Sequence, residues 1–512
     1  PETTPPTSPT GVTASAVSTA RVDLSWNAST DNFGVAGYRV YRNAVRIDSV
    51  TGLNYSDTGL AANTQYSYTV SAYDEAGNES GQSAQVSRYT LAKAGEDASG
   101  SGTGGNVRCI NASKSFWYGA DKVFTFANTT GFGTGGEWKA SRFEYKWNKS
   151  PTETWNTPGT SWSSGTISTL PDAGDGGYYL HVRAFNGDNV PNNNDTLDYG
   201  PFWCDVSPPA AVTVSDEGSW TCSLTTLRAS WTASDDGTGS GINRYEYAVG
   251  TTSSTQDVKS WTSAGLATSV AITGLNLVDG QQYFVQVRAV DNLGQVGPAS
   301  AADGIRVAPE VSRIGLAWGK SDATEGLSLR NKIVTAAVPG AFWLEETDRT
   351  AAIKVVSSAV VQRGNTVSVA GTLGLSGTQR ALFADVVENY GGSAALPRPV
   401  GLTTGRLGGA AFNASTPGVT GGKGLYNIGL LVRCAGRVTC SNSSDPNNKY
   451  FVLDDGSGLS WGGCAGVVVS CGSLNPPTNG WVVVTGICAS EPSEGGVVPV
   501  ILIRDEMDIQ VL

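Results

Sequence analysis

The sequence is poor in histidine and methionine, with one of each among 512 residues. A Ser-His-Asp triad would have to use the single imidazole, His181, and no G-x-S-x-G turn accompanies it. A membrane-spanning helix needs about 18–20 consecutive apolar residues, and no run approaches that length. We therefore expect no catalytic triad and no membrane span in this chain.

Stretches with helical periodicity are also scarce. No segment with apolar residues at the spacing of a helix extends beyond about two turns, whereas Gly, Ser and Thr are abundant. No phosphate-binding loop or dinucleotide fingerprint precedes a helix, so we expect no cofactor. A chain of 512 residues is too long for one domain. The sequence therefore predicts an all-β protein of about three to five domains.

Basic residues are outnumbered, with 34 Lys and Arg against 45 Asp and Glu and a net charge of −11. From Val311 to the end, 15 basic residues cancel 15 acidic ones, so the whole deficit lies in the first 310 residues. Neither an acidic half nor a neutral half attracts a phosphate backbone, which argues against nucleic-acid binding. A negative surface also favours solubility outside the cell.

The chain has eight cysteines, none of them in a C-x-x-C pair or beside the histidine. A zinc site would need four thiolates from scattered strands, so we expect no metal of this kind. An even number of cysteines favours disulfides in an oxidising, extracellular compartment. The chain begins at Pro1 without a secretory leader. We expect that an upstream piece, which could hold a signal peptide or an anchor, was removed or is not represented.

One strand pattern is repeated three times, at Tyr66–Asp74, Tyr178–Asn186 and Tyr283–Asp291. Each copy alternates apolar and polar residues, which is typical of a strand with one buried and one wet face. The copies are about 100 residues apart, the size of one β-sandwich. Their fixed positions should face the core, and the variable ones, including His181, should face water. Tyr66 is placed to form the corner hydrogen bond of such a sandwich.

The first copy belongs to a segment with the motifs W-N-A-S-T-D-N, G-Y-R-V-Y-R and Y-x-Y-x-V-x-A-x-D-x-x-G-N-x-S. This segment resembles the fibronectin type III family of secreted bacterial proteins, with Trp26 expected in the core. The resemblance divides the first 308 residues as follows: a Pro/Thr tail (1–9), a fibronectin type III-like domain (10–91), a flexible Gly/Ser linker (92–106), a divergent fibronectin type III or Ig-like domain (107–206) and a further fibronectin type III-like domain (207–308).

After Pro309 the pattern changes to two sets of five strands, in each of which a V-x-V-x-G-like strand precedes the last. This order resembles tandem OB-folds, which are small five-stranded barrels. We expect one barrel at 309–395 and another at 425–512, with a linking segment at 396–424.

The two-barrel interpretation implies disulfide partners. Strand neighbours in the second barrel favour Cys434–Cys488 and Cys440–Cys471, and the edge strands of the second domain favour Cys109–Cys204. Cys222 and Cys464 are left over and are either free or joined across domains or between subunits. Connectivity cannot be proved from a sequence alone.

Acidic and amide residues cluster at several places without forming an obvious site. Neighbouring residues of a strand point to opposite faces, so adjacent carboxylates are poor acid–base pairs. Such adjacent carboxylates occur at Glu345/Glu346, Asp454/Asp455, Asp235/Asp236 and Asp505/Glu506. The loops at Asp172–Asp175, Asp188–Asn189 and Asn192–Asp195 carry oxygen ligands suited to Ca²⁺ but lack the spacing of a known calcium loop. Turn chemistry explains both groups, and we expect no catalytic residue.

Aromatic residues on the barrels are the remaining candidates for ligand contact. Phe342, Trp343, Tyr450 and Phe451 lie on expected strands, and Trp461 lies in a loop. Such rings stack on bases or sugars in some barrels, and core or interface packing is the simpler explanation. Trp343 and Trp461 are the chosen candidates for ligand or interface contact.

Three functions are compatible with these observations. The first is a non-enzymatic structural or adhesive subunit that self-associates into a surface filament, in which a neighbouring subunit would order the Pro/Thr tail. The second is the accessory carbohydrate-binding region of a secreted enzyme, because fibronectin type III modules often accompany carbohydrate-degrading domains. The third, an extracellular nucleic-acid binder, is disfavoured by charge. The serial β modules, the even cysteine count and the lack of a catalytic constellation favour the filament.

Overall fold

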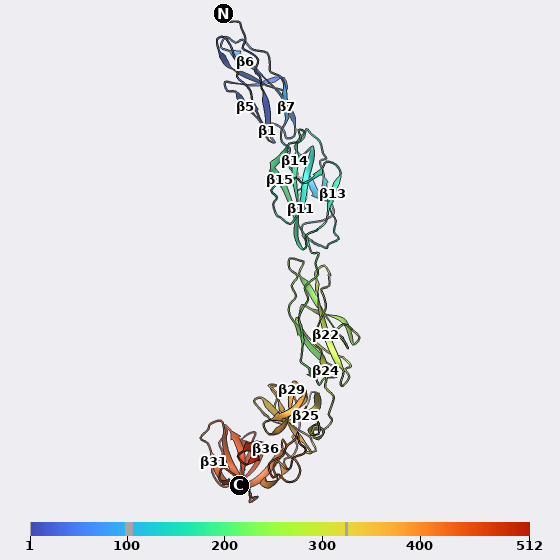
Figure 1. Ribbon diagram of the computed structural model, residues 1–512, viewed down its shortest axis with the longest axis vertical. Coiled ribbons are helices and arrows are strands. Elements are labelled where there is room, and N and C mark those ends of the chain that lie inside the picture. The colour runs from blue at the N-terminus through green and yellow to red at the C-terminus, as the bar shows by residue number, and fades with distance from the viewer. Residues whose placement is uncertain (1, 98–105, 323–325) are drawn as a thin grey trace. The chain divides into compact units, whose positions relative to one another are not determined.

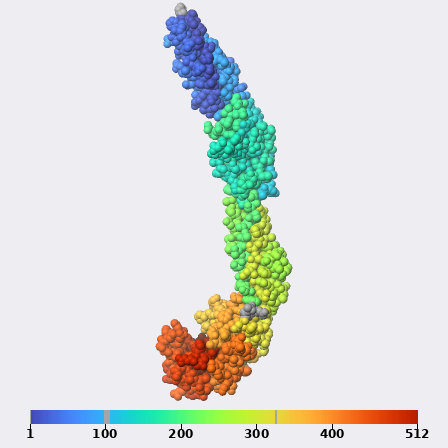
Figure 2. Space-filling view, in the orientation of Figure 1, coloured from blue at the N-terminus to red at the C-terminus, as the bar shows by residue number. Residues whose placement is uncertain are grey.

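The computed structural model describes residues 2–97, 106–322 and 326–512, coloured from blue to red along the chain (Figure 1, Figure 2). Its regular structure is almost entirely strand. The helices in the described ranges are short: α1 (Ile314–Trp318), η1 (Thr404–Arg406) and η2 (Glu506–Asp508). None of them has the length and apolar character that crossing a membrane requires. The predicted all-β class is confirmed.

The chain divides into two compact units. The first contains Pro1–Pro209 together with two later loops, Asp235–Ile242 and Val290–Val296. The second contains Ala210–Ser234, Asn243–Ala289 and Gly297–Leu512. The first unit therefore holds domains one and two and two loops of domain three, and the second unit holds the rest of domain three and the barrels.

Domain one is a sandwich of the sheets β1-β2-β5 and β4-β3-β6-β7. Its strands are β1 (Thr13–Ser18), β2 (Arg21–Ser25), β3 (Val35–Arg42), β4 (Val45–Val50), β5 (Asn54–Thr58), β6 (Gln65–Asp74) and β7 (Val86–Tyr89). Side chains from both sheets form one core. Within it Trp26 meets Tyr38 edge-on, with 5.5 Å between ring centres. The predicted core position of Trp26 is confirmed.

The repeated strand begins with the same tyrosine contact in all three domains. The hydroxyl of Tyr66 accepts a hydrogen bond from the main-chain N of Ala61 at 3.0 Å. The hydroxyls of Tyr178 and Tyr283 accept equivalent bonds from residues five positions upstream, at 2.8 and 2.9 Å. The predicted corner at Tyr66 is confirmed, and it recurs because each copy must turn from loop to strand at the same place.

The Pro/Thr tail packs on domain one itself. The main-chain N of Thr7 donates to the carbonyl of Thr30 at 2.9 Å, and the N of Thr30 donates to Thr7 Oγ1 at 2.9 Å. Pro6 and Pro9 are buried. A loop of the same domain therefore holds the tail, and the expectation that a neighbouring subunit orders it is wrong.

Asn63 forms a joint between domain one and domain two. It is fully buried, and its Nδ2 donates to the carbonyls of Gly133 (2.9 Å) and Lys139 (3.1 Å). Its Oδ1 accepts from the main-chain N of Gly187 at 2.9 Å. All four hydrogen-bonding groups lie in the first unit, so these contacts fix the end of domain one on domain two.

Two further asparagines complete this joint. Asn186 Nδ2 donates to the carbonyls of Tyr89 (3.1 Å) and Thr90 (3.2 Å), and Asn192 Nδ2 donates to the carbonyl of Ala92 at 2.8 Å. The start of the expected linker is thereby packed on domain two, and Ala92 is fully buried. Residues 98–105 of that linker lie outside the described residues.

Domain two is a sandwich of the sheets β13-β10-β8 and β12-β11-β14-β15-β9. Its strands are β8 (Val107–Cys109), β9 (Trp117–Tyr118), β10 (Phe124–Asn128), β11 (Arg142–Asn148), β12 (Thr160–Trp162), β13 (Thr166–Thr169), β14 (Gly176–Phe185) and β15 (Pro191–Cys204). Its core is rich in rings, with Phe124, Phe126 and Phe202 fully buried. The long β14–β15 hairpin extends the larger sheet and carries most of the polar side chains considered below.

Domain three has the sheets β16-β18-β21 and β17-β24-β22-β19-β20, with β23 beside β22. Its strands are β16 (Val214–Asp216), β17 (Trp220–Thr221), β18 (Leu227–Trp231), β19 (Ile242–Gly250), β20 (Lys259–Gly265), β21 (Ser269–Ile272), β22 (Gln282–Asp291), β23 (Ser300–Ala301) and β24 (Ile305–Val307). Trp231 packs 5.9 Å from Tyr245 between ring centres. This pair repeats the Trp26–Tyr38 contact of domain one.

The first barrel is closed, in the order β25-β26-β27-β29-β28. Its strands are β25 (Leu327–Val338), β26 (Ala341–Glu345), β27 (Ala352–Val356), β28 (Thr366–Ser376) and β29 (Gln379–Asn389). β28 returns to pair with β25, and β27 and β29 run parallel. This is the strand order expected for a five-stranded Greek-key barrel.

The second barrel repeats that order as β31-β32-β35-β37-β36, and β36 returns to pair with β31. Its elements are β30 (Val400–Gly401), β31 (Leu431–Asn442), β32 (Lys449–Asp454), β33 (Ser460–Trp461), β34 (Cys464–Ala465), β35 (Val467–Gly472), β36 (Trp481–Ser493), β37 (Gly496–Leu502) and β38 (Ile509–Val511). The small hairpin β33–β34 is an addition that the sequence analysis does not anticipate.

Candidate functional site

The adjacent carboxylates Glu345 and Glu346, at the end of β26 and just after it, lie in different environments. Glu345 is 1% exposed and accepts a hydrogen bond from the main-chain N of Leu431 at 2.8 Å. Burial raises the pKa of Glu345 to about 7. Its neighbour Glu346 instead pairs with Lys332, with 2.9 Å between Nζ and Oε1. The two groups therefore cannot act together on one bond.

The other adjacent carboxylates are engaged in turns and ion pairs. Asp455 accepts from Thr404 through main-chain N and hydroxyl. Asp505 pairs with Arg363 at 2.6 Å. Hydrogen bonds from Thr404 and the ion pair with Arg363 are structural uses of these two carboxylates.

The loops considered for Ca²⁺ serve structural roles. Asp175 Oδ1 accepts from the main-chain N atoms of Val206 (2.7 Å) and Ser207 (2.9 Å). Asp188 Oδ2 accepts from the main-chain N of Tyr89 at 2.9 Å. Asn192 belongs to the joint described above. Each of these oxygens therefore orders a loop or a domain contact.

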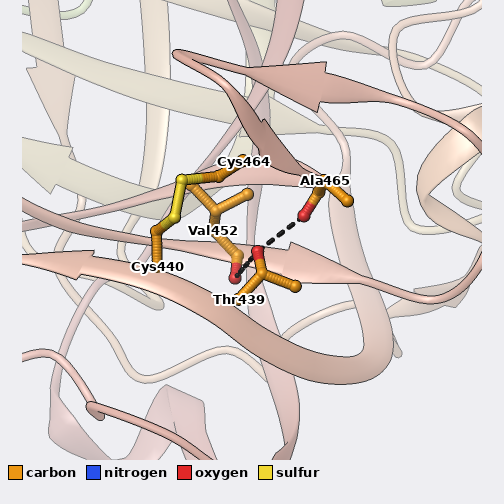
Figure 3. The surroundings of a disulfide bond; sticks show 5 residues. All are labelled: Thr439, Cys440, Val452, Cys464 and Ala465. Carbon is orange, nitrogen blue, oxygen red and sulfur yellow. Dashed lines mark hydrogen bonds between the residues drawn. A yellow bond between two sulfur atoms is a disulfide. The ribbon is translucent and has the colours of Figure 1, made fainter.

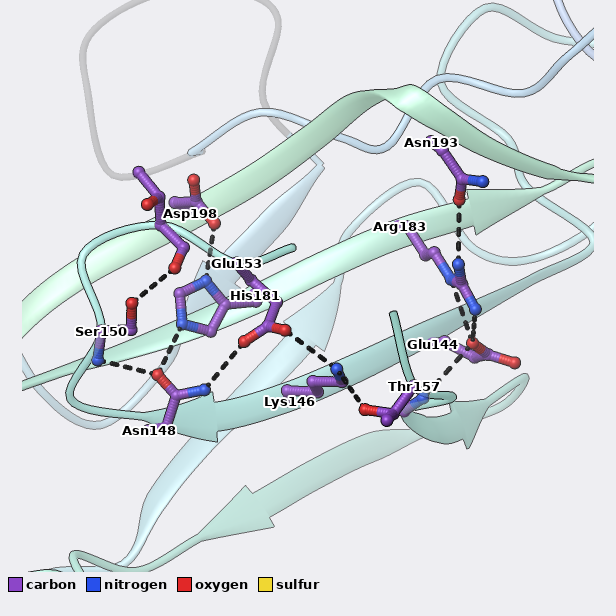
Figure 4. Close-up of polar contacts among 12 residues, drawn as sticks. Glu144, Lys146, Asn148, Ser150, Glu153, Thr157, His181, Arg183, Asn193 and Asp198 are labelled. Carbon is purple, nitrogen blue, oxygen red and sulfur yellow. Dashed lines mark hydrogen bonds and ion pairs between the residues drawn. The ribbon is translucent and has the colours of Figure 1, made fainter. Parts of the chain in front are cut away.

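His181 is fully buried, so the expectation that it faces water is wrong. Its Nδ1 lies 2.6 Å from Asp198 Oδ1 and its Nε2 lies 3.1 Å from Asn148 Oδ1 (Figure 4). Asn148 Oδ1 also accepts from the main-chain N of Ser150, while Asn148 Nδ2 donates to Glu153, which fixes the orientation of the amide. Two side-chain oxygens, one on each ring nitrogen, therefore hold the imidazole in place.

The burial of His181 comes from the loop that follows β11. Glu153 of that loop pairs with Lys146 at 2.9 Å, and the ring of Trp155 lies over the cations of Lys146 and Arg183, at 5.1 and 4.7 Å. Arg183 in turn pairs with Glu144 at 2.6 Å. Figure 4 shows the ion pairs Lys146–Glu153 and Arg183–Glu144 on the same side of the sheet as His181. Every one of these charges has a partner, so the charged groups hold the loop and offer no free acid or base.

The structure pairs Cys440 with Cys464 (Figure 3). The expected Cys440–Cys471 bridge is therefore wrong. The hairpin β33–β34 is the reason, because it folds back over β31 and brings Ala465 within hydrogen-bonding distance of the Thr439 hydroxyl, at 2.6 Å. Cys471 lies on β35, one strand beyond β32.

The other expected bridges also do not form. Cys109, Cys204, Cys434 and Cys488 are buried free thiols, as are Cys222 and Cys471. Register explains one case: Cys434 pairs across the sheet with Val484, four residues before Cys488. Burial raises the pKa of Cys434 and of Cys488 to about 12. Such thiols are protonated and unreactive at neutral pH.

The two chosen tryptophans have different environments. Trp343 is 3% exposed and packs with Leu431 and Ile487 where the two barrels meet. It cannot stack on a sugar, and the ligand role considered for it is wrong. Trp461 is half-buried and packs beside Cys440 and Cys464 on the outer valines of the second barrel. A ligand role for Trp461 stays a prediction.

A set of aromatic rings on domain two, which the sequence analysis overlooks, is more accessible. Trp117 and Trp203 are paired across β9 and β15, with 5.5 Å between ring centres. Trp203 is 40% exposed. Their neighbours Tyr118 and Cys204 face the core, so alternation along the strands places both tryptophans on the outer face of the sheet. Tyr179 of β14 also lies on this outer face, because Tyr178 and Leu180 on either side of it are core residues.

Two glycines let these rings lie against the sheet. A Cβ atom at Gly177 would lie 3.4 Å from the Trp203 ring, and one at Gly200 would lie 2.6 Å from the Tyr179 ring. The missing side chains leave room for each ring to cover the neighbouring strand. Trp117, Tyr179 and Trp203 form what we call the outer aromatic surface. Trp203 is the most exposed ring of this surface, at 40%, and part of it is available for contact.

The second unit has an apolar pocket of about 460 Å³ beside the first barrel. Trp318 and Tyr426 form its floor, with 4.8 Å between ring centres, and both are nearly buried. Phe412 and Leu425 at its edge are 52% and 89% exposed. The segment 396–424 contributes to this pocket and is therefore packed rather than free.

The chain matches two domain families in part. Residues 7–89 match the fibronectin type III domain, and residues 219–308 match the Rha78A-like, N-terminal immunoglobulin domain. Among solved structures, the FN1-FN3 domains of chicken CNTN1 are 17% identical and cover 59% of this chain and 100% of their own, with a TM-score of 0.20. That score is too low to support an argument about arrangement.

Curated relatives with similar sequence include polysaccharide-degrading enzymes. Exoglucanase B of Cellulomonas fimi is 32% identical over 387 residues, which cover 72% of this chain and 32% of that protein. Chitinase Chi52 of Paenibacillus xylanexedens is 51% identical over 90 residues, covering 18% and 17%. Alpha-amylase of Niallia circulans is 47% identical over 92 residues, covering 18% and 7%. The chain thus spans about a third or less of each.

These relatives overturn the filament hypothesis. Proteins named exoglucanase, chitinase and amylase are enzymes that act on polysaccharides, and none of these three is named as a filament subunit. The expectation of a self-assembling surface fibre is therefore wrong, and the second hypothesis, an accessory region of a carbohydrate-active enzyme, is favoured. The chain contains a fibronectin type III domain and an immunoglobulin-like domain, followed by two five-stranded barrels.

Proposed function

We propose that this chain is a non-catalytic, extracellular region of a larger polysaccharide-degrading enzyme and that it contacts the polysaccharide through the outer aromatic surface. The observation that carries the proposal is the similarity to exoglucanase B, which extends over 387 residues and so reaches beyond any single domain. That similarity covers only 32% of exoglucanase B, which leaves room elsewhere in such a protein for a catalytic domain.

The ionisable groups support a non-catalytic role. Hydrolysis of a glycosidic bond ordinarily needs two carboxyl groups about 5–10 Å apart on either side of the substrate. Glu345 is buried between the barrels and Glu346 pairs with Lys332. The charged groups around His181 are all paired. None of these groups is both free and accessible to a sugar chain.

The outer aromatic surface has the chemistry needed for glycan contact. A pyranose ring has an apolar face of C–H groups, which packs well on the flat face of an aromatic ring. Tryptophan provides the largest such face, and Trp203 and Trp117 lie next to each other on one strand pair. A run of neighbouring rings suits a polymer better than it suits a small ligand, because successive sugars can contact successive rings.

Binding of the whole chain to insoluble cellulose, chitin and starch tests the proposal. We expect the wild-type chain to be retained on at least one of these polymers and Trp203→Ala to bind about tenfold more weakly, because one stacking contact contributes about 1–3 kcal/mol. Trp481→Ala is the matched control, since Trp481 is 56% exposed but lies on the second barrel.

Two outcomes would contradict the proposal. Absence of retention on all three polymers would remove the glycan contact. An equal loss for Trp203→Ala and Trp481→Ala would show that exposed tryptophan, rather than the outer aromatic surface, is responsible.

A further inference from the structure

Three loops of the first unit bring Asp205, Asp236 and Asp291 together. Asp205 follows β15, Asp236 lies in the loop after β18, and Asp291 ends β22. One carboxylate oxygen from each lies within 4.8 Å of those of the other two. All three residues belong to the first unit, which includes the loops Asp235–Ile242 and Val290–Val296.

Asp205 and Asp291 are buried and Asp236 is half-buried, and two oxygens of the cluster have no hydrogen-bond partner. Asp205 is fully buried and Asp291 is 1% exposed. Asp291 Oδ2 and Asp236 Oδ1 are both inaccessible to solvent and unpartnered. A buried carboxylate oxygen ordinarily accepts at least one hydrogen bond, because leaving it unpaired is costly. These two oxygens can therefore act as ligands within the cluster.

The remaining oxygens are held firmly by main-chain donors. Asp291 Oδ1 accepts from the N atoms of Leu293 and Gln295, each at 2.8 Å. Asp236 Oδ2 accepts from the N of Gly241 at 2.7 Å. Each of these aspartates is thus fixed through one oxygen, and its second oxygen is left for another partner.

Asp205 is fixed through both of its oxygens. Its Oδ2 accepts from the N of Ser240 at 2.9 Å and its Oδ1 accepts from Gln295 Nε2 at 3.0 Å. The hydroxyl of Ser240 is itself buried and unpartnered. Fixed carboxylates with free oxygens are the arrangement of a built ligand site rather than of a mobile acidic surface.

The charges of the cluster repel one another. Asp205, Asp236 and Asp291 each bring a carboxylate, and one oxygen of each lies within 4.8 Å of those of the other two. Like charges held together out of water destabilise a fold unless a cation neutralises them.

Domain one provides an internal comparison. Its sequence repeats the pattern: Glu2-Thr-Thr-Pro-Pro corresponds to Asp205-Val-Ser-Pro-Pro, Asp31 follows Trp26 as Asp236 follows Trp231, and Asp74 ends the repeated strand as Asp291 does. In domain one the amide of Asn78 donates to Asp74 Oδ2 at 2.8 Å. Domain three has Gln295 at the position of Asn78, and its longer side chain reaches Asp205 instead. The oxygen that domain one satisfies with an amide is therefore free in domain three.

We propose that Asp205, Asp236 and Asp291 form a Ca²⁺ site. Carboxylate oxygens are the ligands that this hard cation prefers, and three of them with water molecules satisfy its coordination. The cluster has no imidazole or thiolate ligand, which argues against zinc and copper. Burial excludes a sugar chain, so the cluster is not a catalytic pair. A bound ion would tie the segment after β15 to the two loops at Asp235–Ile242 and Val290–Val296.

Calorimetric titration of the chelator-treated, full-length chain with CaCl₂ tests the site. We expect one site with a Kd of about 1 mM or tighter, the range of extracellular calcium modules. Calcium should also slow hydrogen exchange in the two loops, because ligand binding suppresses local opening. Magnesium should bind at least tenfold more weakly, because it gives up its water reluctantly.

Three variants separate the site from general charge effects. Asp291→Asn keeps the Oδ1 hydrogen bonds but removes one charge, and it should weaken calcium binding at least tenfold. Gln295→Asn keeps all three carboxylates and installs the amide of domain one, and it should also weaken binding. Asp235→Asn removes a neighbouring charge that only caps the turn at Gly237, and it should bind as the wild type does.

Three results would overturn the proposal. The first is a wild-type chain that binds no calcium at about 10 mM, well above the range of such modules. The second is unchanged binding by Asp291→Asn. The third is equal affinity for magnesium, which would remove the assignment to calcium.

Discussion

We predict how the replacement of Glu345 by glutamine changes the free energy of unfolding of the barrels. The difference between variant and wild type should favour the variant more at alkaline pH than at acidic pH. Glu345 ends β26 and is 1% exposed, and one of its oxygens accepts from Leu431 N at 2.8 Å. Its other oxygen, Oε1, is buried without a partner. Glutamine keeps the acceptor for Leu431 and carries no charge.

The magnitude follows from the pKa. Burial raises the pKa of Glu345 from 4.5 to about 7. The folded state therefore retains a proton that the unfolded chain releases, and stability falls as the pH rises from about 4.5 to about 7. At 1.36 kcal/mol for each pKa unit, this loss is about 3 kcal/mol. Glu345→Gln does not undergo this loss, so its stability relative to the wild type should increase by about 3 kcal/mol between pH 4.5 and pH 8.

Hydrogen exchange of peptides from β26 and β31 measures this effect locally, which suits a chain of several domains better than a single unfolding transition. Comparison of variant and wild type at the same pH cancels the intrinsic effect of pH on exchange. The ratio of the variant's protection factor to that of the wild type should rise about a hundredfold from pH 4.5 to pH 8. Glu346→Gln is the matched control and should lower protection at pH 8, because it breaks the ion pair with Lys332. A ratio for Glu345→Gln that is the same at both pH values would refute the reasoning.

Two further predictions concern the joint and the disulfide. Asn63→Ala removes three hydrogen bonds of about 1 kcal/mol each and should increase exchange at Gly187 at least tenfold. Asn43→Ala is the control, because Asn43 has the same left-handed backbone geometry and its side chain accepts one hydrogen bond. This variant should leave exchange at Gly187 unchanged. Equal effects of the two variants would contradict the joint. Replacement of Cys440 and Cys464 by serine opens a cross-link over 24 residues and should destabilise the second barrel in urea by about 3 kcal/mol. An unchanged urea midpoint would argue against that cross-link.

The local strand pattern was sufficient to predict the sandwiches and the barrels. The alternation of the repeated strand and the position of Tyr66 depend on contacts within one domain, and the structure contains both. The two sets of five strands likewise follow from local sequence, because strand order in a small barrel is set by short connections. The all-β class therefore followed from the sequence alone.

Contacts made by insertions were not predictable in this way. Alternation places His181 on the face opposite the core, but the ring is fully buried there and contacts Asn148, which in turn binds Glu153 of the loop after β11. The hairpin β33–β34 similarly moved Cys464 over Cys440. Neither insertion has a pattern that reveals where it folds back.

The carboxylate cluster was missed for a different reason. Asp205, Asp236 and Asp291 are far apart in the sequence, and each alone resembles an ordinary turn residue. A comparison of the two fibronectin-like repeats could have found them, because the acidic positions recur at Glu2, Asp31 and Asp74. The difference between Asn78 and Gln295 was the signal that separated the two sites.

The joint between domains one and two has a consequence for engineering the chain. Its hydrogen bonds run from the side-chain amides of Asn63, Asn186 and Asn192 to main-chain carbonyls. Every residue type supplies a main-chain carbonyl, so the loop around Gly133 and Lys139 can change its side chains without loss of acceptors. The carbonyl side of each hydrogen bond therefore tolerates substitution, whereas the asparagine side does not. A different domain could be grafted onto domain one if it presented the same backbone path, whereas loss of a single asparagine would loosen the junction.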